Sequence, residues 1–139
     1  MIGVIVAGHG KFASELISTA ERVVGKQKYI EAVSVKVGEE EDNLREKLSA
    51  VLRMSEISKV IVLVDIFGSS FCNTCMHVAE DTEDLDIVAG VNLPMLIKVL
   101  THRDEVDLRK LVSLACEGGK EGILDIREWL EKAKQLKKS

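Results

Sequence analysis

The segment VIVAGHGKF, residues 4–12, joins an apolar run to a histidine that lies between two glycines. A continuous run of β-branched and apolar residues is typical of a strand buried on both faces of a sheet. Beyond Lys11, apolar residues recur at helical spacing until Gly25, which predicts a helix that begins near Phe12. The segment therefore predicts a strand followed by a helix, with His9 in the loop between them.

The same alternation continues along the chain. Further strands are expected at residues 29–35, 59–65 and 85–91. Helices are expected at residues 38–54, within 67–81, at 94–102, at 106–119 where paired glycines end the helix, and at 127–138. The segment GILDI, residues 122–126, has the composition of a short strand. Strands that alternate with helices predict a parallel sheet covered on both faces, so the expected fold class is α/β, a single-domain three-layer sandwich.

Composition and charge limit the class of protein. The 139 residues fit one domain, and 46% hydrophobic with 30% charged residues is typical of a soluble globular chain. Three cysteines, an odd number, suit a reducing cytoplasm. The apolar run at residues 2–7 is too short for a signal peptide, and no stretch reaches the roughly 18 residues of a membrane span, so we expect a cytoplasmic protein without membrane insertion. The net charge of −4 argues against a nucleic-acid partner.

His9 and Asp65 follow two strands that are expected to be neighbours. The carboxyl ends of parallel strands lie at one edge of a sheet, and ligands bind where the strand order reverses. In the common order 2-1-3-4, the strands before His9 and Asp65 lie about 4.8 Å apart, so the two side chains can meet. Singly, the histidine is an ordinary loop residue and the aspartate a helix cap. As a pair, the carboxylate fixes the tautomer of the ring and leaves the second ring nitrogen as a nucleophile.

Glycines and helix starts surround this pair. Gly8 and Gly10 lack a Cβ and leave room beside His9, and the helix that begins near Phe12 directs backbone N–H groups toward that space. The turn Gly68–Ser70 introduces the next helix with two hydroxyls and further N–H donors. A phosphoryl group fits such an anion site, and no nucleotide-binding loop of the G-x-x-x-x-G-K-[ST] type occurs. We therefore expect a transferable phosphohistidine, with no cofactor and no metal.

Three blocks of the sequence, in this order and spacing, resemble a known family. They are IVAGHGKFASELISTAERVVG at residues 5–25, VLVDIFGSSFCNT at 62–74 and AGVNLPMLIKVL at 89–100. Together they resemble the enzyme IIA component of the mannose-type sugar phosphotransferase system, and the resemblance runs from about Ile2 to Ile123. The corresponding domain would cover residues 1–125, and residues 126–139 would form a C-terminal helical extension.

The resemblance implies a fold, a reaction and partners. The family has a four-stranded parallel sheet of order 2-1-3-4 and a short fifth strand that is exchanged between the subunits of a homodimer. In the family, the histidine that corresponds to His9 accepts a phosphoryl group from the phosphocarrier HPr and passes it to enzyme IIB. Asp65 corresponds to the aspartate that hydrogen-bonds this histidine, and Ser70 to a serine near the phosphoryl group. Since the chain ends soon after the domain, no fused enzyme IIB is expected.

The chain departs from the family pattern in one loop. The family usually reads D-x-x-G-G-S-P, whereas here the block is DIFGSSF, so Ser69 replaces a glycine and Phe71 replaces the proline. These changes affect the turn and the fit of a partner. Four apolar residues at the expected active edge are interpreted as a rim for a protein partner: Phe12, Phe67, Phe71 and Met95.

Two other functions fit the same residues. A regulatory module would keep the phosphohistidine at His9 and deliver its signal to a partner outside transport. A receiver-type signalling domain would be phosphorylated on Asp65, but such a domain needs acidic magnesium ligands after its first strand, where this chain has AGHGK. The CNTC segment, Cys72–Cys75, has the spacing of a metal or redox pair, and buried small apolar residues are the interpretation that we favour.

Overall fold

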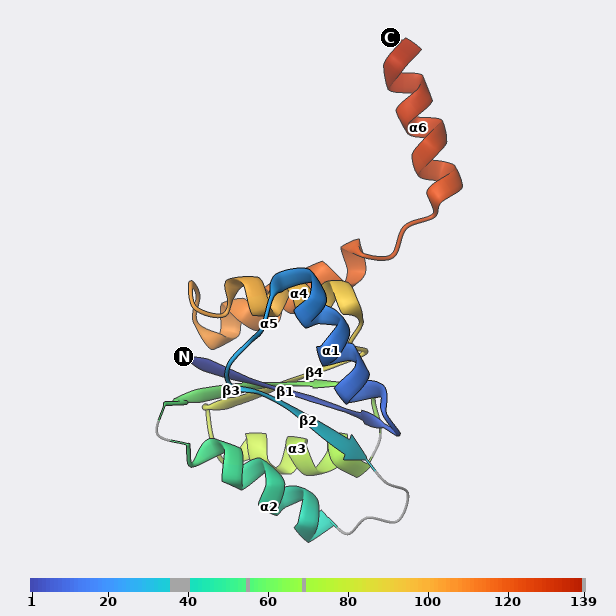
Figure 1. Cartoon of the computed structure of the whole chain (residues 1–139). Helices are drawn as coiled ribbons and strands as arrows, with labels where there is room; N and C mark the ends of the chain where they lie inside the picture. The colour runs from blue at the N-terminus through green and yellow to red at the C-terminus, as the bar shows by residue number, and fades with distance from the viewer. Residues whose placement is uncertain (36–40, 55, 69, 139) are drawn as a thin grey trace.

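The computed structural model describes residues 1–35, 41–54, 56–68 and 70–138, with the backbone alone described at 41–44, 47 and 70. Four strands lie in one sheet: β1 Ile2–His9, β2 Ile30–Val35, β3 Lys59–Val64 and β4 Leu85–Ala89. Six helices are described: α1 Phe12–Val24, α2 Glu41–Leu52, α3 Ser70–Glu80, α4 Leu93–His102, α5 Leu108–Glu121 and α6 Ile126–Lys138. Figure 1 shows the sheet between two helical layers, with α6 extending away from them.

The sheet is parallel throughout and has the order β2-β1-β3-β4. Helices α1, α4 and α5 cover one face and α2 and α3 cover the other (Figure 1). The predicted fold class, an α/β three-layer sandwich with strand order 2-1-3-4, is confirmed. The central strands β1 and β3 are neighbours, so their carboxyl ends meet at the point where the strand order reverses.

Alternate residues of the central strands enter the two halves of the core, as the two-residue period of a strand requires. On β1, Val4 and Val6 pack toward α1 and α4, whereas Ile5 and Ala7 pack toward α2 and α3. These four side chains are essentially inaccessible to solvent. Burial on both faces explains why the strand is a continuous apolar run, and it holds the end of β1 in a fixed position beneath the site.

The paired glycines Gly118 and Gly119 do not end α5, contrary to the prediction. The helix continues through them to Glu121, and both glycines are buried against α4. A Cβ at Gly118 would lie 2.8 Å from Lys98 Cβ, and one at Gly119 would lie 2.9 Å from Met95 Cε. The glycines therefore allow two helices to pack closely, which local sequence signals for a helix end do not distinguish.

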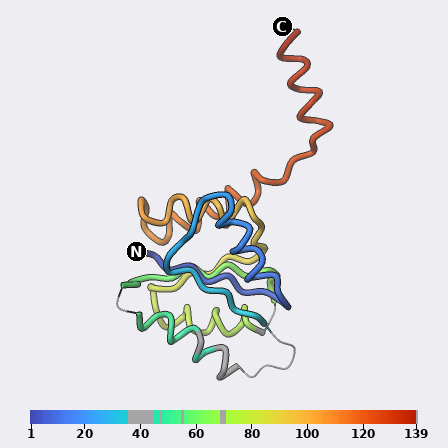
Figure 2. The backbone as a smooth tube through the Cα atoms, in the orientation of Figure 1, coloured from blue at the N-terminus to red at the C-terminus, as the bar shows by residue number. Residues whose placement is uncertain are grey.

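The GILDI segment forms no strand in this single chain. Residues 122–125 connect α5 to α6, and Ile126 is already helical. Ile123 and Leu124 are largely exposed. The tube in Figure 2 leaves the body of the protein along this segment and continues into α6. The fifth strand and its exchange between subunits therefore stay predictions, and so does the domain boundary at residue 125.

A buried arginine holds the end of the sheet opposite to His9. Arg103, only 4% exposed, follows α4. Its guanidinium donates hydrogen bonds to the carbonyl oxygens of Ile2, Lys28 and Tyr29 and to the side-chain oxygen of Gln27. These bonds join α4 to the start of β1 and to the turn before β2. Within the described residues, no helix has both the length and the apolar character that a membrane span needs.

Candidate functional site

The site is built on the carboxyl ends of β1 and β3. His9 is the last residue of β1, and Asp65 directly follows β3. The backbone N–H of Asp65 donates to the carbonyl oxygen of Ala7 at 3.0 Å, which extends the ladder between the strands by one residue. Parallel pairing in this register brings the two side chains together from positions 56 residues apart in the chain.

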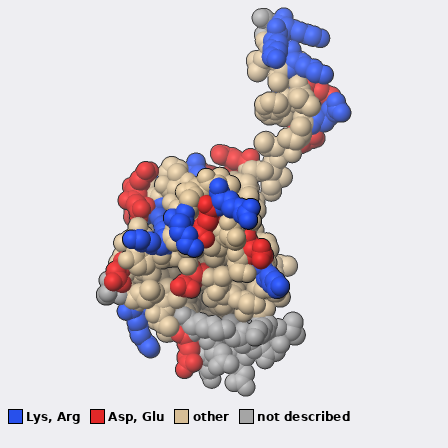
Figure 3. All heavy atoms as spheres, viewed as in Figure 1, with Lys and Arg blue, Asp and Glu red and all other residues tan. Residues whose placement is uncertain are grey.

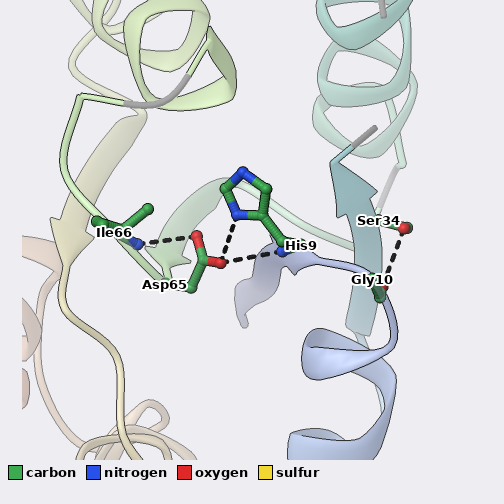
Figure 4. A network of polar contacts seen from close by, with 5 residues as sticks. All are labelled: His9, Gly10, Ser34, Asp65 and Ile66. Carbon is green, nitrogen blue, oxygen red and sulfur yellow. Dashed lines mark hydrogen bonds and ion pairs between the residues drawn. The ribbon is translucent and has the colours of Figure 1, made fainter. Parts of the chain in front are cut away.

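Asp65 binds both His9 and its own following residue (Figure 4). Its Oδ2 accepts hydrogen bonds from the backbone N–H of His9 at 2.9 Å and from His9 Nδ1 at 2.8 Å. Its Oδ1 accepts from the backbone N–H of Ile66 at 2.8 Å. The predicted pairing of His9 with Asp65 is thus present in the structure. Three N–H donors fix the carboxylate, and the carboxylate in turn fixes the imidazole ring.

Asp65 is held in its ionised form. Partial burial raises the pKa of Asp65, but hydrogen bonds from the side chain and backbone of His9 and from the backbone of Ile66 outweigh it, so that this pKa lies below its usual value. A carboxylate can only accept hydrogen bonds, so His9 Nδ1 carries the proton of the 2.8 Å contact. In the neutral ring the lone pair is then on Nε2, which points away from Asp65 in Figure 4.

Two loops with left-handed glycines border the site. Gly10, at φ 58°, directly precedes the residue that caps α1, and its carbonyl oxygen accepts a hydrogen bond from Ser34 on β2 at 3.0 Å. Gly68, at φ 89°, lies two residues before α3. A Cβ would meet no heavy atom within 4 Å at either glycine, so the space beside both is open. Of the predicted phosphoryl-binding residues, Ser69 lies outside the described residues, and of Ser70 only the backbone is described.

The space at Gly8 is filled by the protein itself. A Cβ at Gly8 would lie 2.6 Å from Phe12 Cδ1 and 3.3 Å from Asp65 Oδ2. The first residue of α1 therefore places its ring against the backbone of β1 at Gly8. The room expected at Gly8 for a ligand is used by an aromatic side chain, whereas Gly10 keeps the open space that was expected of both glycines.

Of the four residues predicted to form a partner rim, two are exposed and two are buried. Phe67 is 72% exposed and Phe12 is 39% exposed. Phe71 and Met95 are instead buried, because Phe71 lies on the side of α3 that packs against the sheet and Met95 on the side of α4 that packs against α5. The prediction of an exposed rim is wrong for these two residues. The phenylalanine that replaces the proline of the family pattern extends the core.

Two contributions to the site were not predicted. Ile66 donates its backbone N–H to Asp65 Oδ1, and its side chain is an exposed apolar group beside Phe67. Ser34 holds the carbonyl oxygen of Gly10 from the neighbouring strand. The first is a backbone contact that any residue could make. The second depends on the register of β1 with β2, in which Ser34 pairs with Gly8, and no local sequence signal shows that register.

The cysteine pair has the character expected of core residues. Cys72 and Cys75 are both buried, on the inner side of α3. Burial, together with the neighbouring Cys72 sulfur, raises the pKa of the Cys75 thiol to about 12, so this thiol stays protonated at neutral pH. Among the described residues, no three His, Cys, Asp or Glu side chains gather as the ligands of a metal ion would.

The fold and the site together define a parallel α/β domain that carries a histidine–aspartate pair at the switch point of its sheet. The sequence model of the family described as "PTS system fructose IIA component" matches residues 3–115. The chain therefore belongs to this family of EIIA components of the sugar phosphotransferase system. The family predicted from the three sequence blocks is confirmed.

Individual relatives agree with this assignment. The PTS system mannose-specific EIIAB component of Escherichia coli (strain K12) is 36% identical over 124 residues, which are 88% of this chain and 38% of that protein. This chain thus spans about two fifths of the length of that relative. The PTS system fructose-specific EIIA component of Bacillus subtilis (strain 168) is 33% identical, over 96% of this chain and 92% of that protein.

A solved structure supports the fold. The phosphotransferase system component EIIA from Streptococcus agalactiae superposes with a TM-score of 0.83 over 92% of this chain and 99% of that chain. Its sequence identity to this chain is 24%. The sandwich with four parallel strands is therefore shared with that protein.

The close approach at Gly8 generates a stability prediction. Gly8→Ala must displace the Phe12 ring, so we expect a loss of about 1–3 kcal/mol in the free energy of unfolding, as for other overpacked sites. In the Phe12→Ala background the same substitution costs less, because the ring is absent. Denaturant unfolding of both single variants and of the double variant measures this coupling.

Gly10→Ala is the matched control for this cycle. It costs about 1–2 kcal/mol through its left-handed backbone, since nothing fills the space beside it. That cost should be the same with and without the Phe12 ring. Additive effects for Gly8→Ala and Phe12→Ala would contradict the contact described above.

The hydrogen bonds of Asp65 predict a pH dependence of stability. Because the pKa of folded Asp65 lies below its unfolded value of about 3.9, its bonds stabilise the protein above that pH and are lost as the pH falls through the folded pKa. Asp65→Asn should therefore cost about 1–3 kcal/mol at pH 5 and progressively less toward pH 2. Urea unfolding of both proteins across this range, with the exposed Asp81→Asn as the control, measures the difference. A difference that grows with acidity would contradict the charged pair.

Proposed function

We propose that this chain is a cytoplasmic phosphocarrier, in which His9 accepts a phosphoryl group from phosphorylated HPr and passes it to enzyme IIB for sugar uptake. The observation that carries the proposal is the 2.8 Å contact between His9 Nδ1 and Asp65 Oδ2 at the switch point of the sheet. This contact turns Nε2 away from the carboxylate (Figure 4) and gives the ring the tautomer of a nucleophile. Membership of the EIIA family supports the same reaction class.

The transfer proceeds in two displacements at the same atom. The lone pair of Nε2 attacks the phosphorus of phosphohistidine on HPr, the nitrogen–phosphorus bond of HPr breaks, and the HPr ring keeps that electron pair. The Nδ1 proton of His9 stays directed at Asp65, whose negative charge stabilises the positive charge that develops on the ring. The second displacement transfers the group from Nε2 to a nucleophile of enzyme IIB and restores the neutral imidazole.

The surrounding loops are suited to hold the phosphoryl oxygens. The open spaces beside Gly10 and Gly68 allow a bulky anion to approach, and the starts of α1 and α3 supply backbone N–H groups with a positive helix end. We assign Ser70 to this binding loop from the resemblance to the family, and Ser69 from its hydroxyl in the same turn. These donors stabilise the transferring group without a cofactor or metal.

An exposed apolar surface beside the site fits the docking of protein partners. Phe12, at the start of α1, and Ile66 and Phe67, directly after Asp65, expose their side chains. Apolar anchors surrounded by polar residues are typical of the centres of protein interfaces. HPr and enzyme IIB would therefore reach the ring by covering these three side chains in turn.

Phosphorylation of Asp65 itself, as in a receiver-type domain, is disfavoured by the geometry. Both carboxylate oxygens already accept hydrogen bonds from backbone N–H groups or the His9 ring. A phosphoryl acceptor must present an oxygen to the incoming phosphorus. A regulatory module phosphorylated on His9 would use the same chemistry with a different second partner.

Reconstitution tests the proposed transfer. Incubation with phosphoenolpyruvate, enzyme I and HPr should add one phosphoryl group to the wild-type chain, stable in alkali and labile in acid, and none to His9→Ala. Asp65→Asn should fold and accept the group with a rate lower by on the order of 10², about 2.7 kcal/mol of barrier, because a neutral amide no longer supports the charged ring. Undiminished labelling of His9→Ala would end the proposal, and an unchanged rate in Asp65→Asn would make Asp65 a structural cap only.

We also propose that the chain forms a homodimer through the exposed segment around Ile123 and Leu124. Ile123 is 76% exposed and Leu124 is 60% exposed. Among the described residues, β4 lies at one edge of the sheet and pairs with a neighbouring strand on one side only. Pairing of the segment with a sheet edge of a second copy would cover both. Sedimentation velocity should show a dimer at micromolar concentration, and Ile123→Asp should shift it toward the monomer. A monomeric wild-type chain at these concentrations would contradict the exchange.

A further inference from the structure

The C-terminal helix α6 presents an apolar face that nothing in the single chain covers. Ile126, Trp129, Leu130 and Ala133 recur at the spacing of one helical face. No residue of α6 is buried, and Trp129 is 56% exposed. Figures 1 and 2 show the whole helix projecting from the body of the protein. An exposed amphipathic helix of this kind requires a surface to pack on.

The helix is also basic, whereas the rest of the chain is acidic. Residues 126–139 contain five Lys and Arg against two Glu, a net charge of +3, which leaves −7 on residues 1–125 out of the total of −4. Figure 3 shows the basic side chains gathered toward the outer end of α6. Three of them follow the apolar face: Lys134, Lys137 and Lys138. Three of the five basic side chains of α6 thus lie in its last five residues, beyond the apolar positions 126–133.

A surface of the same polarity lies between α3 and the edge strand β4. A cavity of about 500 Å³ is lined there by apolar groups that include Phe67, Met76 and Ile87, and by the carboxylates of Glu80 and Asp86. A second cavity of about 460 Å³ shares Ala79 and Asp86 with it and adds Glu83 to the lining. The two cavities adjoin at Ala79 and Asp86, and together they are called the α3–β4 groove. This groove is apolar beside Phe67, and its other end is bordered by the acidic turn between α3 and β4, by Lys59 and by the start of α5.

This turn concentrates negative charge. Within residues 80–86, EDTEDLD, five of seven side chains are carboxylates and none is basic. Asp86 pairs with Arg109 at 3.1 Å, and Lys59 also borders the second cavity. Two cations among these groups leave the acidic end of the groove with a net negative charge. It therefore complements the basic end of α6.

We propose that α6 of one copy docks into the α3–β4 groove of a second copy. The indole of Trp129 enters the apolar end beside Phe67 and Met76, and Lys134 to Lys138 lie along the acidic residues 80–86. The apolar residues of the helix face the apolar end of the groove and its basic residues face the acidic end. This pairing fixes the direction of the helix in the groove. The inference rests on the self-association proposed above and not on the phosphotransfer chemistry.

A second copy fits better than the protein's own body. In the single chain, α6 projects away from the body of the protein (Figure 1). Residues 122–125, which separate α5 from α6, begin beside the edge strand, because Ile123 lines a cavity with Val88 and Ala89 of β4. The same short segment that leads α6 away from its own body would carry it to the sheet edge of a second copy. Exchange between two copies places both helices at once through the same interface, as two-fold symmetry allows.

The tryptophan emission of the full chain reports this docking. Trp129 is the single tryptophan, so its emission should be blue-shifted at high protein concentration and shift to the red on dilution, in step with dissociation of the dimer. Two charge variants test whether α6 is the segment that occupies the groove. The helix variant is Lys134→Glu/Lys137→Glu, and the groove variant is Glu80→Lys/Glu83→Lys. Alone, each opposes like charges and should weaken association by about 10-fold.

Mixing the two variants separates docking on a second copy from docking on the own body. In the mixed dimer each helix meets a groove of opposite charge, so the blue-shifted emission should return only on mixing. The control is Glu31→Lys/Glu46→Lys, with the same charge change at exposed positions on β2 and α2, which should keep wild-type emission and should not restore the helix variant.

The outcomes distinguish this proposal from the proposed function. All of these variants keep His9 and Asp65 and should still accept a phosphoryl group at His9, which His9→Ala does not. An emission that is independent of concentration, or that does not respond to mixing, would overturn docking on a second copy even if the dimer and the phosphotransfer stand. In that case, a blue shift caused only by vesicles of anionic lipid would assign α6 to a membrane surface.

Discussion

The hydrogen bond between Asp65 and His9 depends on one constraint, the direct parallel pairing of β1 with β3. Only neighbouring strands bring the two residues within 2.8 Å, and the bond from the Asp65 backbone to Ala7 shows that the register continues into the site. Two buried apolar strands hold this register, because a slip by one residue would turn every side chain to the other face. The hydrophobic core and the reactive pair are therefore consequences of the same arrangement.

The carboxylate serves as the fixed point of the site. It accepts hydrogen bonds from three N–H groups, one of them on the imidazole, and these bonds favour its charged form and orient it. Phe12 packs into the space that Gly8 leaves beside the end of β1. The charge that supports His9 thus lies on one side of the ring, and the opposite nitrogen points away from it (Figure 4). A reaction at that nitrogen needs no movement of the core.

The sequence predicts the parts of this structure that depend on regular periodicity. The buried runs, the helical spacing after Phe12 and the placement of His9 and Asp65 at strand ends all follow from local patterns, and the strand order follows from the family resemblance. The exceptions depend on what faces a residue across space. Gly118 and Gly119 allow packing against α4, and Phe71 faces the sheet. The sequence does not predict the hydrogen bond from the Ile66 backbone, because any residue could donate it. It also does not predict the bond from Ser34 to Gly10, because that bond depends on how β1 pairs with β2.

The central claim is that the Nε2 atom of His9, opposite the carboxylate, carries the phosphoryl group. Two-dimensional proton–nitrogen NMR of the phosphorylated, ¹⁵N-labelled chain, with phosphorus coupling, identifies the bonded ring nitrogen directly. We expect coupling between phosphorus and Nε2 of His9, with the Nδ1 proton retained in its hydrogen bond to Asp65. Phosphorus bonded to Nδ1, or an acyl phosphate on Asp65 that hydroxylamine removes, would contradict the account.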